Sequence, residues 1–400
     1  MLPQFVSKDS QTLWEQRKLG DCFTERVESM PDGELISVTI NDGIKKFSEL
    51  GRHDNSNDDK SKYKKVCIGD IAYNSMRMWQ GASGYSPYEG IVSPAYTVLS
   101  PNSGINSKCL AYQFKLPEMI HTFQINSQGI TSDNWNLKYP ALSEIEIFVS
   151  RNEKEQAKIS EYFEGLDRLI TLHQRKFEKL TNVKKSMLEK MFPQNGSSYP
   201  EVRFKGFTDP WEQRKLGDIG EARSGVGFPD AEQGGVTGIP FFKVSDMNLG
   251  GNENEMTVAN NYVTAEQIAV HRWSPITELP AIFFAKVGAA VMLNRKRLCR
   301  FPFLLDNNTM AYSLSSTKWD ADFAKALFGT VDLTSLVQVG ALPSYNAGDV
   351  ESMEIYLPSL LEQEQIGGFF KQLDNLISLH QRELEKLQNI KKSMLEKMFV

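Results

Sequence analysis

The clearest pattern of apolar and polar positions occurs twice, towards the end of each half of the chain. Core-type residues recur at alternating spacings of four and three, with charged residues between them, which is typical of the buried stripe of a coiled-coil helix. The first stripe comprises Ile159, Phe163, Leu166, Ile170, His173, Phe177 and Leu180, and the second Ile366, Phe370, Leu373, Ile377, His380, Leu384 and Leu387. Such stripes can be buried only against each other or against another chain. We therefore predict two long helices that pair antiparallel within the chain.

Both stripes change phase at equivalent points. The apolar positions shift to Val183, Met187 and Met191 in the first helix, and to Ile390, Met394 and Met398 in the second. The seam therefore changes its phase or its partner there. These methionines fit a helix core or a docking surface for a partner better than a cofactor site.

The two stripe histidines also occupy equivalent positions. A ligand or proton-transfer role is one interpretation of His173 and His380. A buried, hydrogen-bonded histidine that fixes helix register is the favoured one.

Internal repeats show why the pattern occurs twice. The octapeptide WEQRKLGD stands at residues 14–21 and again at 211–218, and KKSMLEKMF stands at 184–192 and at 391–399. Glu155–Phe192 aligns without a gap on Glu362–Phe399, with 25 of 38 positions identical. The intervening stretches, about residues 22–150 and 219–357, show little resemblance to each other. The chain therefore reads as two copies of one unit, each with a constant entry, a variable body and a constant helix.

The two bodies are predicted to be mixed α/β. Apolar and β-branched runs predict strands at Glu34–Ile40, Asp70–Asn74, Ile91–Leu99, Ala281–Val287 and Ala289–Asn294, and short helices are expected at Pro117–Gln124 and Ala321–Leu327. The segment 193–210 is rich in Pro, Gly and Ser and is predicted to be a linker.

These elements define the expected architecture. We expect a first body at residues 1–150, a helix at 151–192, the linker at 193–210, a second body at 211–358 and a helix at 359–400. The predicted fold class is two α/β domains separated by two long antiparallel helices that form an intramolecular coiled coil, with a pseudo-twofold repeat.

Net charge, cysteine spacing and the length of apolar runs exclude several classes of protein. The formal net charge of −5 argues against a protein that holds nucleic acid by bulk positive charge, so DNA binding would need local basic patches or a partner. The four cysteines contain no C-x-x-C pair and form no ligand cluster with the histidines, which argues against a structural zinc site or a disulfide framework. No apolar run approaches the roughly 20 residues of a membrane span, and the start lacks the apolar core of a signal peptide, so we expect a cytoplasmic protein.

The repeated segments and several body motifs together resemble the specificity subunit of type I restriction-modification systems. The body motifs are GDIAYNSMRMWQGASG at residues 69–84, GIVSPAY at 90–96, FFAKVGAAVMLNRKR at 283–297, DNNTMAY at 306–312 and ALPSYNAGD at 341–349. LPSLLEQEQI at 357–366 resembles the entry to the spacer helix of that family, whereas its counterpart FVSRNEKEQAKI at 148–159 lacks the Leu-Pro.

The resemblance implies that each body is a target-recognition domain for one half of a bipartite, asymmetric DNA sequence, and that the helices set the gap. It also implies partners: double-stranded DNA, two modification subunits that methylate adenine with S-adenosylmethionine, and restriction subunits that use ATP. The chain itself would hold no cofactor and no catalytic centre, with S-adenosylmethionine, ATP and Mg²⁺ on the partner subunits.

Candidate DNA-binding residues are cations and amides near strand ends, because Arg pairs with guanine and Asn or Gln with adenine. In the first body these are Asn74, Arg77 and Gln80, with Lys62 and Lys64 as phosphate contacts, and in the second body they are Asn294, Arg295, Lys296, Arg297 and Asn307. The resemblance adds Arg223, Lys243 and Tyr345. Each candidate also has a purely structural interpretation. The lysines could belong to a solvated loop, the second-body cluster could be a charged turn, and the aromatic residues beside the first cluster could pack in the core.

Other functions fit less well. An adenine methyltransferase needs a glycine-rich cofactor loop and an Asn/Asp-Pro-Pro-aromatic segment, and the nearest approach, at residues 93–96, lacks the second proline. A nuclease pattern at Asp32 and Asp58-Asp59-Lys60 falls in a polar loop with no apolar strand to hold it. The remaining alternative is a scaffold protein whose helices serve assembly without nucleic acid.

Overall fold

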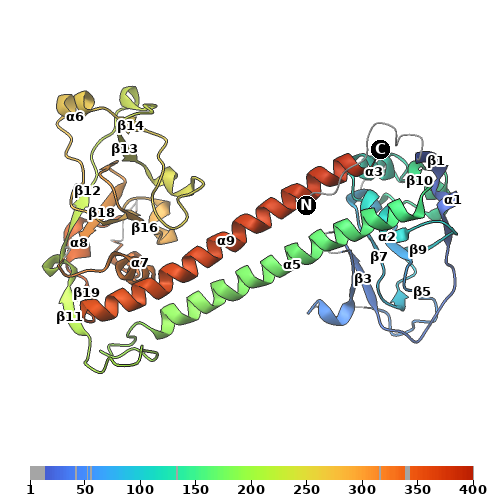
Figure 1. Ribbon diagram of the computed structural model, residues 1–400, viewed down its shortest axis with the longest axis horizontal. Helices are drawn as coiled ribbons and strands as arrows, with labels where there is room; N and C mark the ends of the chain where they lie inside the picture. Colours follow the sequence, from blue (N-terminus) through green and yellow to red (C-terminus); the bar gives the residue numbers. More distant parts are fainter. Residues whose placement is uncertain are drawn as a thin grey trace. The chain divides into compact units, whose positions relative to one another are not determined.

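The computed structural model describes residues 14–40, 43–51, 53–54, 56–131, 134–314, 317–337 and 343–399. The chain divides into two units, one of Met1–His173 with Glu383–Val400 and the other of Gln174–Arg382. Each unit thus contains one body, the start of one long helix and the end of the other. Figure 1 labels many of the helices and strands. Residues 1–13 of the expected first domain, and Ala341 and Leu342 of the ALPSYNAGD motif, lie outside the described residues.

The first body is built on a four-stranded antiparallel sheet. Its strand order is β2 (Phe23–Glu25), β9 (Tyr96–Pro101), β6 (Ile71–Asn74) and β7 (Ser83–Tyr85). Two-stranded sheets pair β1 (Trp14–Lys18) with β10 (Glu146–Ser150), β3 (Ile36–Thr39) with β4 (Gly43–Lys46), and β5 (Lys64–Val66) with β8 (Gly90–Val92). The helices are α1 (Leu19–Cys22), α2 (Ser107–Gln113), α3 (Pro117–Ile125) and α4 (Tyr139–Ser143).

The second body repeats this plan. Its four-stranded sheet has the order β12 (Gly220–Ser224), β18 (Thr309–Leu314), β15 (Ala281–Ala285) and β16 (Lys296–Cys299), and β11 (Glu212–Lys215) pairs with β19 (Glu354–Leu357). A further sheet joins β14 (Tyr262–Val263), β13 (Ile239–Phe242) and β17 (Leu304–Leu305), and the helices are α6 (Ala265–His271), α7 (Ala321–Thr330) and α8 (Ala347–Glu351). Because β12-β18-β15-β16 matches β2-β9-β6-β7, the duplication extends through bodies whose sequences show little resemblance.

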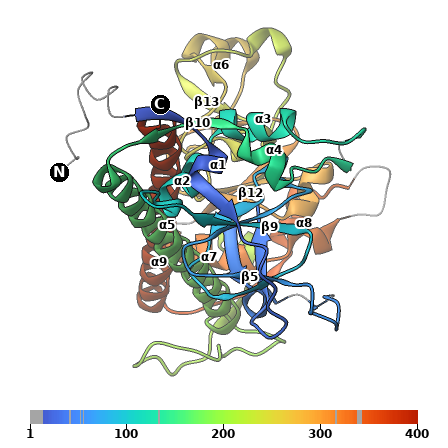
Figure 2. The ribbon, with the colours of Figure 1, turned by 90° about the vertical axis from the view of Figure 1, so that its right-hand side faces the viewer.

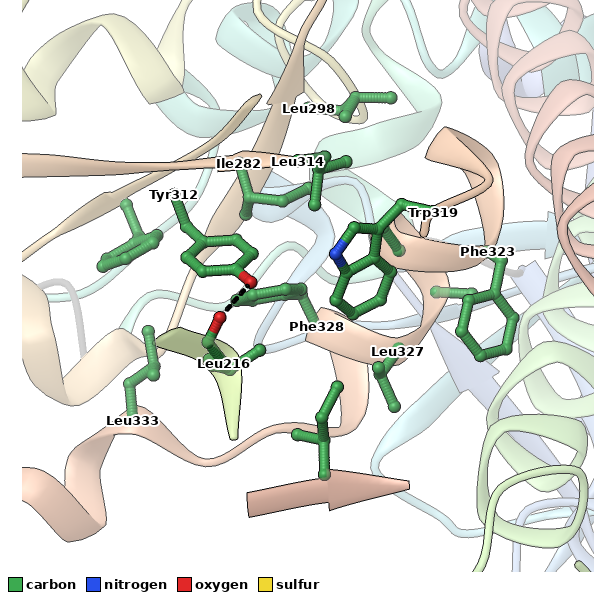
Figure 3. Close-up of a cluster of buried hydrophobic side chains, with 14 of the residues drawn as sticks. Leu216, Ile282, Leu298, Tyr312, Leu314, Trp319, Phe323, Leu327, Phe328 and Leu333 are labelled. Carbon is green, nitrogen blue, oxygen red and sulfur yellow. Dashed lines mark hydrogen bonds between the residues drawn. The ribbon is translucent and has the colours of Figure 1, made fainter. Parts of the chain in front are cut away.

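The core of the second body lies between its sheet and α7. Tyr312 is buried among apolar side chains and donates its hydroxyl proton to the carbonyl oxygen of Leu216, at 2.8 Å (Figure 3). Trp319 packs edge-on to Tyr312 and donates its indole N–H to the carbonyl of Ile219. Since Leu216 belongs to the second copy of WEQRKLGD, the constant entry segment is part of the core.

The long helices are α5 (Glu153–Lys190) and α9 (Leu360–Met398). In the first unit, the buried Ile159, Phe163 and Leu166 of α5 share a core with the end of α9 and with α2, which lies beside α5 (Figure 2). In the second unit, the buried Ile366, Phe370 and Leu373 of α9 share a core with the end of α5. The start of each helix therefore packs beside the end of the other, which confirms the predicted antiparallel pairing and the predicted fold class.

The two repeated sequence motifs meet each other in both units. Trp14, of the first octapeptide, packs edge-on against Phe399, of the second nonapeptide, with 6.2 Å between ring centroids. Trp211 packs in the same way against Phe192, at 5.9 Å. The predicted phase shift after Leu180 is also explained, because Val183, Met187 and Met191 turn into the core of the second body. This contact explains why WEQRKLGD and KKSMLEKMF have the same sequence in both copies, because each motif packs against the other.

Two predicted strands differ from the structure. Ala289–Asn294 was expected as a strand, but Ala289–Leu293 forms a 3-10 helix, and the strand β16 follows it. The cause is backbone geometry, since Gly288 and Asn294 on either side have φ values of 81° and 49° that no strand accommodates. Ile91–Leu99 is divided between β8 and β9 by a turn closed by a hydrogen bond from Tyr96 N–H to the carbonyl of Ser93.

The other local expectations agree better with the structure. Strands occur within Glu34–Ile40, Asp70–Asn74 and Ala281–Val287, and helices at Pro117–Ile125 and Ala321–Thr330 confirm the two predicted short helices. The linker 193–210 contains no helix or strand, but it is held in place, because Arg203 forms a bidentate ion pair with the buried Glu362 at 2.7 and 2.8 Å. The exact domain boundaries stay predictions.

Candidate nucleic-acid interface

The loop between β6 and β7 brings three of the predicted residues together. Asn74 ends β6 and accepts a hydrogen bond from the backbone of Met76 on its side-chain oxygen, at 3.0 Å. Arg77 is exposed, and its backbone N–H donates to the carbonyl of Asn74, at 2.9 Å. A 3-10 turn at Met78–Gln80 follows, and Gly81 closes it with a φ of 82°. This turn places Asn74, Arg77 and Gln80 on one short loop.

Two interactions hold this loop. Lys115 donates from Nζ to the carbonyls of Gly81 at 2.6 Å and Ser83 at 2.8 Å. Burial lowers the pKa of Lys115 to about 8. Trp79 donates its indole N–H to the carbonyl of Met76 and packs edge-on against Trp135, with 5.2 Å between centroids. These hydrogen bonds and the ring contact therefore fix the backbone of the loop, while the Arg77 side chain remains exposed.

The side-chain oxygen of Gln80 is buried and has no hydrogen-bond partner among the described residues. The oxygen of Asn136, which follows Trp135, is in the same state. A buried amide oxygen without a partner is destabilising. Both therefore have acceptor capacity left for a water molecule or for a bound donor.

The loop between β15 and β16 occupies the same topological position in the second body. It contains the 3-10 helix Ala289–Leu293, which Asn294 closes in a left-handed conformation. Gly288 N–H donates to the carbonyl of Pro343 at 2.9 Å, and the hydroxyl of Tyr345 donates to the carbonyl of Ala285 at 2.6 Å. Tyr345 is buried, and burial raises the pKa of its hydroxyl group. In this structure Tyr345 supports the loop from inside the protein.

The predicted basic cluster of the second body is less exposed than its sequence indicates. Lys296 and Arg297 lie in β16, whereas they were expected to follow a strand. Lys296 donates to the side-chain oxygen of Asn294 at 2.7 Å and also to the carbonyl of Val331. Arg297 donates to the carbonyls of Asn252 at 2.7 Å and Lys296 at 2.9 Å. Burial lowers the pKa of Lys296 to about 8 and also lowers the pKa of Arg297.

Arg295 is exposed, and its guanidinium donates to the side-chain oxygen of Asn248 at 2.7 Å. Arg295, Lys296 and Arg297 help line a polar cavity of about 340 Å³ in the second unit, together with Asp322 and Asp374. Within the described part of the chain, none of these three cations lies within ion-pair distance of a carboxylate. The structure therefore brings the three together on a wall of a cavity.

The remaining candidates lie on other elements. Asn307 is exposed in the turn between β17 and β18, Arg223 is half-buried in β12, and Lys243 donates to the side-chain oxygen of Gln233 at 3.0 Å. Lys62 is exposed, and Lys64 pairs with Glu25 at 3.2 Å. The stripe residues Ile170, His173, Phe177, Ile377, His380 and Leu384 are half-buried, while most of their neighbours are exposed. DNA contact by each candidate stays a prediction.

Comparison with known proteins places this geometry in a family. The family model for the type I restriction modification DNA specificity domain matches the chain twice, over residues 12–182 and 208–389. The chain belongs to this family. Each match covers one body and most of one long helix, so the specificity domain corresponds to one copy of the repeat.

Relatives of the specificity-domain family resemble the chain over most of its length. The type I restriction enzyme MjaVIII specificity subunit of Methanocaldococcus jannaschii is 22% identical over 374 residues, which cover 84% of this chain and 81% of that protein. The MjaIX specificity subunit of the same organism is 24% identical over 307 residues, which cover 74% of this chain and 69% of that protein. The crystal structure of a type I restriction-modification S subunit from M. genitalium matches with a TM-score of 0.63 at 16% identity, over 100% of this chain and 98% of that chain. The structural likeness shows a shared fold.

Sequence reasoning missed the residues that hold the two loops of this specificity-domain chain. Lys115 stands in an unremarkable segment, and no local signal indicates that its side chain reaches three backbone carbonyls. The equivalence of the β6–β7 and β15–β16 loops was hidden because their sequences differ, and only the strand order reveals it. Over the described ranges, no three His, Cys, Asp or Glu side chains gather as metal ligands, and no helix could span a membrane.

Proposed function

We propose that this chain is the sequence-specific DNA-binding specificity subunit of a type I restriction-modification complex. Each body reads one half of a bipartite, asymmetric DNA site, and the long helices dock the modification subunits and set the spacer between the half-sites. The observation that carries this proposal is a duplicated framework with two different loops at its equivalent positions. The same strand order and the same Trp–Phe contact recur in both units, whereas the loops after β6 and β15 differ.

A fixed spacer requires a fixed helix register, and a repeated ion pair supports it. In the first unit Lys391 of α9 pairs with Asp167 of α5 at 2.5 Å, and in the second unit Lys184 of α5 pairs with Asp374 of α9 at 2.5 Å. The two pairs are equivalent by the repeat offset, since 374 − 167 and 391 − 184 both equal 207. A slip of one helix against the other would break both pairs, so they favour one register.

The second unit adds a further cation to its pair. Lys325 of α7 lies 2.8 Å from Asp374, whose side chain is 8% exposed. Burial raises the pKa of Asp374, but Lys325 and Lys184 outweigh that effect, so the pKa lies below its ordinary value. The ionised carboxylate therefore connects the body, through α7, to both long helices.

Exposed leucines on the helices support docking of two like partners. Leu169 and Leu172 of α5 are 45% and 46% exposed, and the equivalent Leu376 and Leu379 of α9 are 43% and 51% exposed. All four lie off the seam stripe, so helix pairing does not account for their identity in the two copies. Exposed apolar residues that recur at equivalent places are typical of an interaction site. Two modification subunits of one kind would need two such sites.

The chain acts in this proposal as a subunit without chemistry of its own, in the cytoplasm. Its modification partners methylate adenine with S-adenosylmethionine, and its restriction partners use ATP and Mg²⁺. The residues of the chain hold the partners and position the DNA. The need for S-adenosylmethionine, ATP and Mg²⁺ would then come from the partner subunits and not from this chain.

Footprinting of the full chain with its co-expressed modification subunits tests the proposal. We expect two protected blocks of defined sequence with an unprotected gap between them. Exchange of the first body for that of a relative should change only one block. A scaffold protein would give co-purification with partners but no sequence-dependent protection, and that result would reject the proposal.

A further inference from the structure

The two equivalent loops share a feature that base readout by hydrogen bonds does not require. Each exposes large apolar side chains at its tip: Met76 is 47% exposed, and Met292 and Leu293 are each 58% exposed. Each loop leaves the same central strand of its sheet, β6 in one body and β15 in the other. The feature therefore recurs at one topological position in bodies that otherwise differ in sequence.

Both loops are built as rigid turns with an apolar anchor. Met78 is fully buried beneath the first turn, and Val291 is 2% exposed beneath the second. Hydrogen bonds from Lys115 fix the first loop, and those made by Tyr345 and Gly288 fix the second. The exposed apolar side chains are therefore attached to a backbone that these hydrogen bonds fix in place. To bury them in the core of their own body, the loops would have to break these hydrogen bonds.

Each apolar tip has at least one cation close to it in the sequence. Arg77 follows Met76 directly and is exposed, and the exposed Arg295 lies two residues after Leu293. Lys286 precedes the second 3-10 helix and is half-buried. An apolar side chain beside a cation matches the chemistry of a DNA wedge, in which Met or Leu enters a base step while Arg or Lys contacts the adjacent phosphates.

We infer that these loops are apolar wedges, and that Met76 in the first body and Met292 with Leu293 in the second enter a base step of their own half-site and unstack it. The inference rests on the proposed function and adds a mode of recognition to it. Each body then reads the deformability of its half-site as well as its base edges, because unstacking costs less at flexible steps.

A protein partner is the competing occupant of these tips. One kind of partner bound to both bodies would require similar loops, yet SMRMWQGA at residues 75–82 and KVGAAVMLNR at 286–295 differ in length and sequence. The surfaces that are alike in the two copies lie on the helices. Loops that differ between the bodies fit a ligand that also differs, which is the case for two unlike DNA half-sites.

The experiment uses the full chain with its co-expressed modification subunits on DNA whose half-sites have been located by footprinting. 2-Aminopurine is placed at successive positions across each half-site, because its fluorescence rises when it is unstacked. We expect a position of enhanced fluorescence in each half-site with the unaltered chain. The variant Met292→Ala/Leu293→Ala should lose the enhancement in the second half-site only, and Met76→Ala in the first only. Binding should weaken by about tenfold or more for the double variant, because it removes two exposed apolar side chains that the DNA would bury in the complex.

Matched controls separate a wedge from general damage. Met292→Leu keeps an apolar tip and should retain the enhancement, and Val270→Ala removes an apolar side chain that is 76% exposed on α6 and should change nothing. Footprints with no enhanced position, or enhancement unchanged in Met292→Ala/Leu293→Ala, would overturn the wedge and leave the proposed function intact. Loss of modification subunits from the double variant with normal enhancement would assign the tips to a protein partner. Absence of any footprint would instead reject the proposed function.

Discussion

The contact between the two repeated motifs makes a quantitative prediction about stability. Phe192 is 2% exposed and packs against three rings, those of Trp211, Phe323 and Phe370, at centroid distances of 5.9, 5.6 and 5.9 Å. Removal of a buried phenylalanine ring costs ~3–5 kcal/mol, and with three ring partners we expect about 4 kcal/mol for Phe192→Ala. The loss should fall on the second unit, which contains all four residues.

The equivalent change in the other copy is the matched comparison. Phe399 is 8% exposed and packs against two rings, Trp14 and Phe163, each at 6.2 Å. With fewer ring partners and more exposure, Phe399→Ala should cost about 3 kcal/mol, and its effect should fall on the first unit.

Hydrogen exchange followed by peptide mass spectrometry measures the two units separately, because opening free energies are local. In Phe192→Ala, peptides from β12 and β18 should exchange faster while those from β2 and β9 keep their protection, and Phe399→Ala should give the reverse. Leu361→Ala, at a position that is 62% exposed, is the control and should leave both patterns unchanged. Equal effects of either Phe variant on both units, or a cost below about 1 kcal/mol, would refute the reasoning.

Three further outcomes are expected. Asp374→Asn should destabilise the second unit by about 2 kcal/mol in thermal unfolding at neutral pH, because Lys184 and Lys325 lose their carboxylate. The deficit relative to the unaltered chain should begin to shrink as the pH falls below about 4, the pKa of an unfolded aspartate, and should vanish once the pH lies below the folded pKa of Asp374; a deficit that does not shrink at all as the pH falls would contradict this assignment. Lys115→Met should weaken protection of the first half-site in footprinting while the second stays protected, since only the first loop loses its support; equal weakening of both would point to a general folding defect. Leu169→Asp/Leu172→Asp should reduce the number of modification subunits that co-purify from two to one, as measured by native mass spectrometry, and retention of both would remove these leucines from the docking site.

The pH dependence expected for Asp374→Asn follows from the direction in which the fold shifts the pKa of Asp374. The pKa of Asp374 in the folded chain lies below its ordinary value, because Lys325 and Lys184 outweigh the effect of burial. The carboxylate therefore contributes stability above the pKa of the unfolded state, and that contribution is lost as the pH falls through the folded pKa.

The long helices could be predicted from the sequence because their signal is local and repeated. A stripe such as Phe163 to Phe177 specifies both a helix and the face to be buried, and the duplicate at Phe370 to Leu384 supplies the partner. The 3-10 helix at Ala289–Leu293 could not be predicted in this way. Its apolar, partly branched sequence suits a strand, and its conformation depends on a positive φ at Gly288 and on hydrogen bonds with Pro343 and Tyr345, which are remote in sequence.

The candidate DNA-binding residues likewise include some features that the sequence predicted and others that it could not. Asn74, Arg77 and Gln80 were predicted as one cluster because they are close in sequence, and the structure places them on one loop. The cluster from Asn294 to Arg297 was predicted from its charge, but charge does not report burial. β16 turns Lys296 and Arg297 towards backbone carbonyls, and this depends on strand pairing that the sequence does not reveal.

The interleaved composition of the two units affects the order in which a nascent chain can complete them. The second unit is one continuous stretch, Gln174–Arg382, whereas the first also needs Glu383–Val400. As the chain leaves the ribosome, the first body is made before the second unit, but its Trp14 and Phe163 lack the ring of Phe399 until Phe399 itself has been made. The first unit can therefore be completed only after the second has been synthesised, and a translation product that stops before Glu383 carries an open core in its first body.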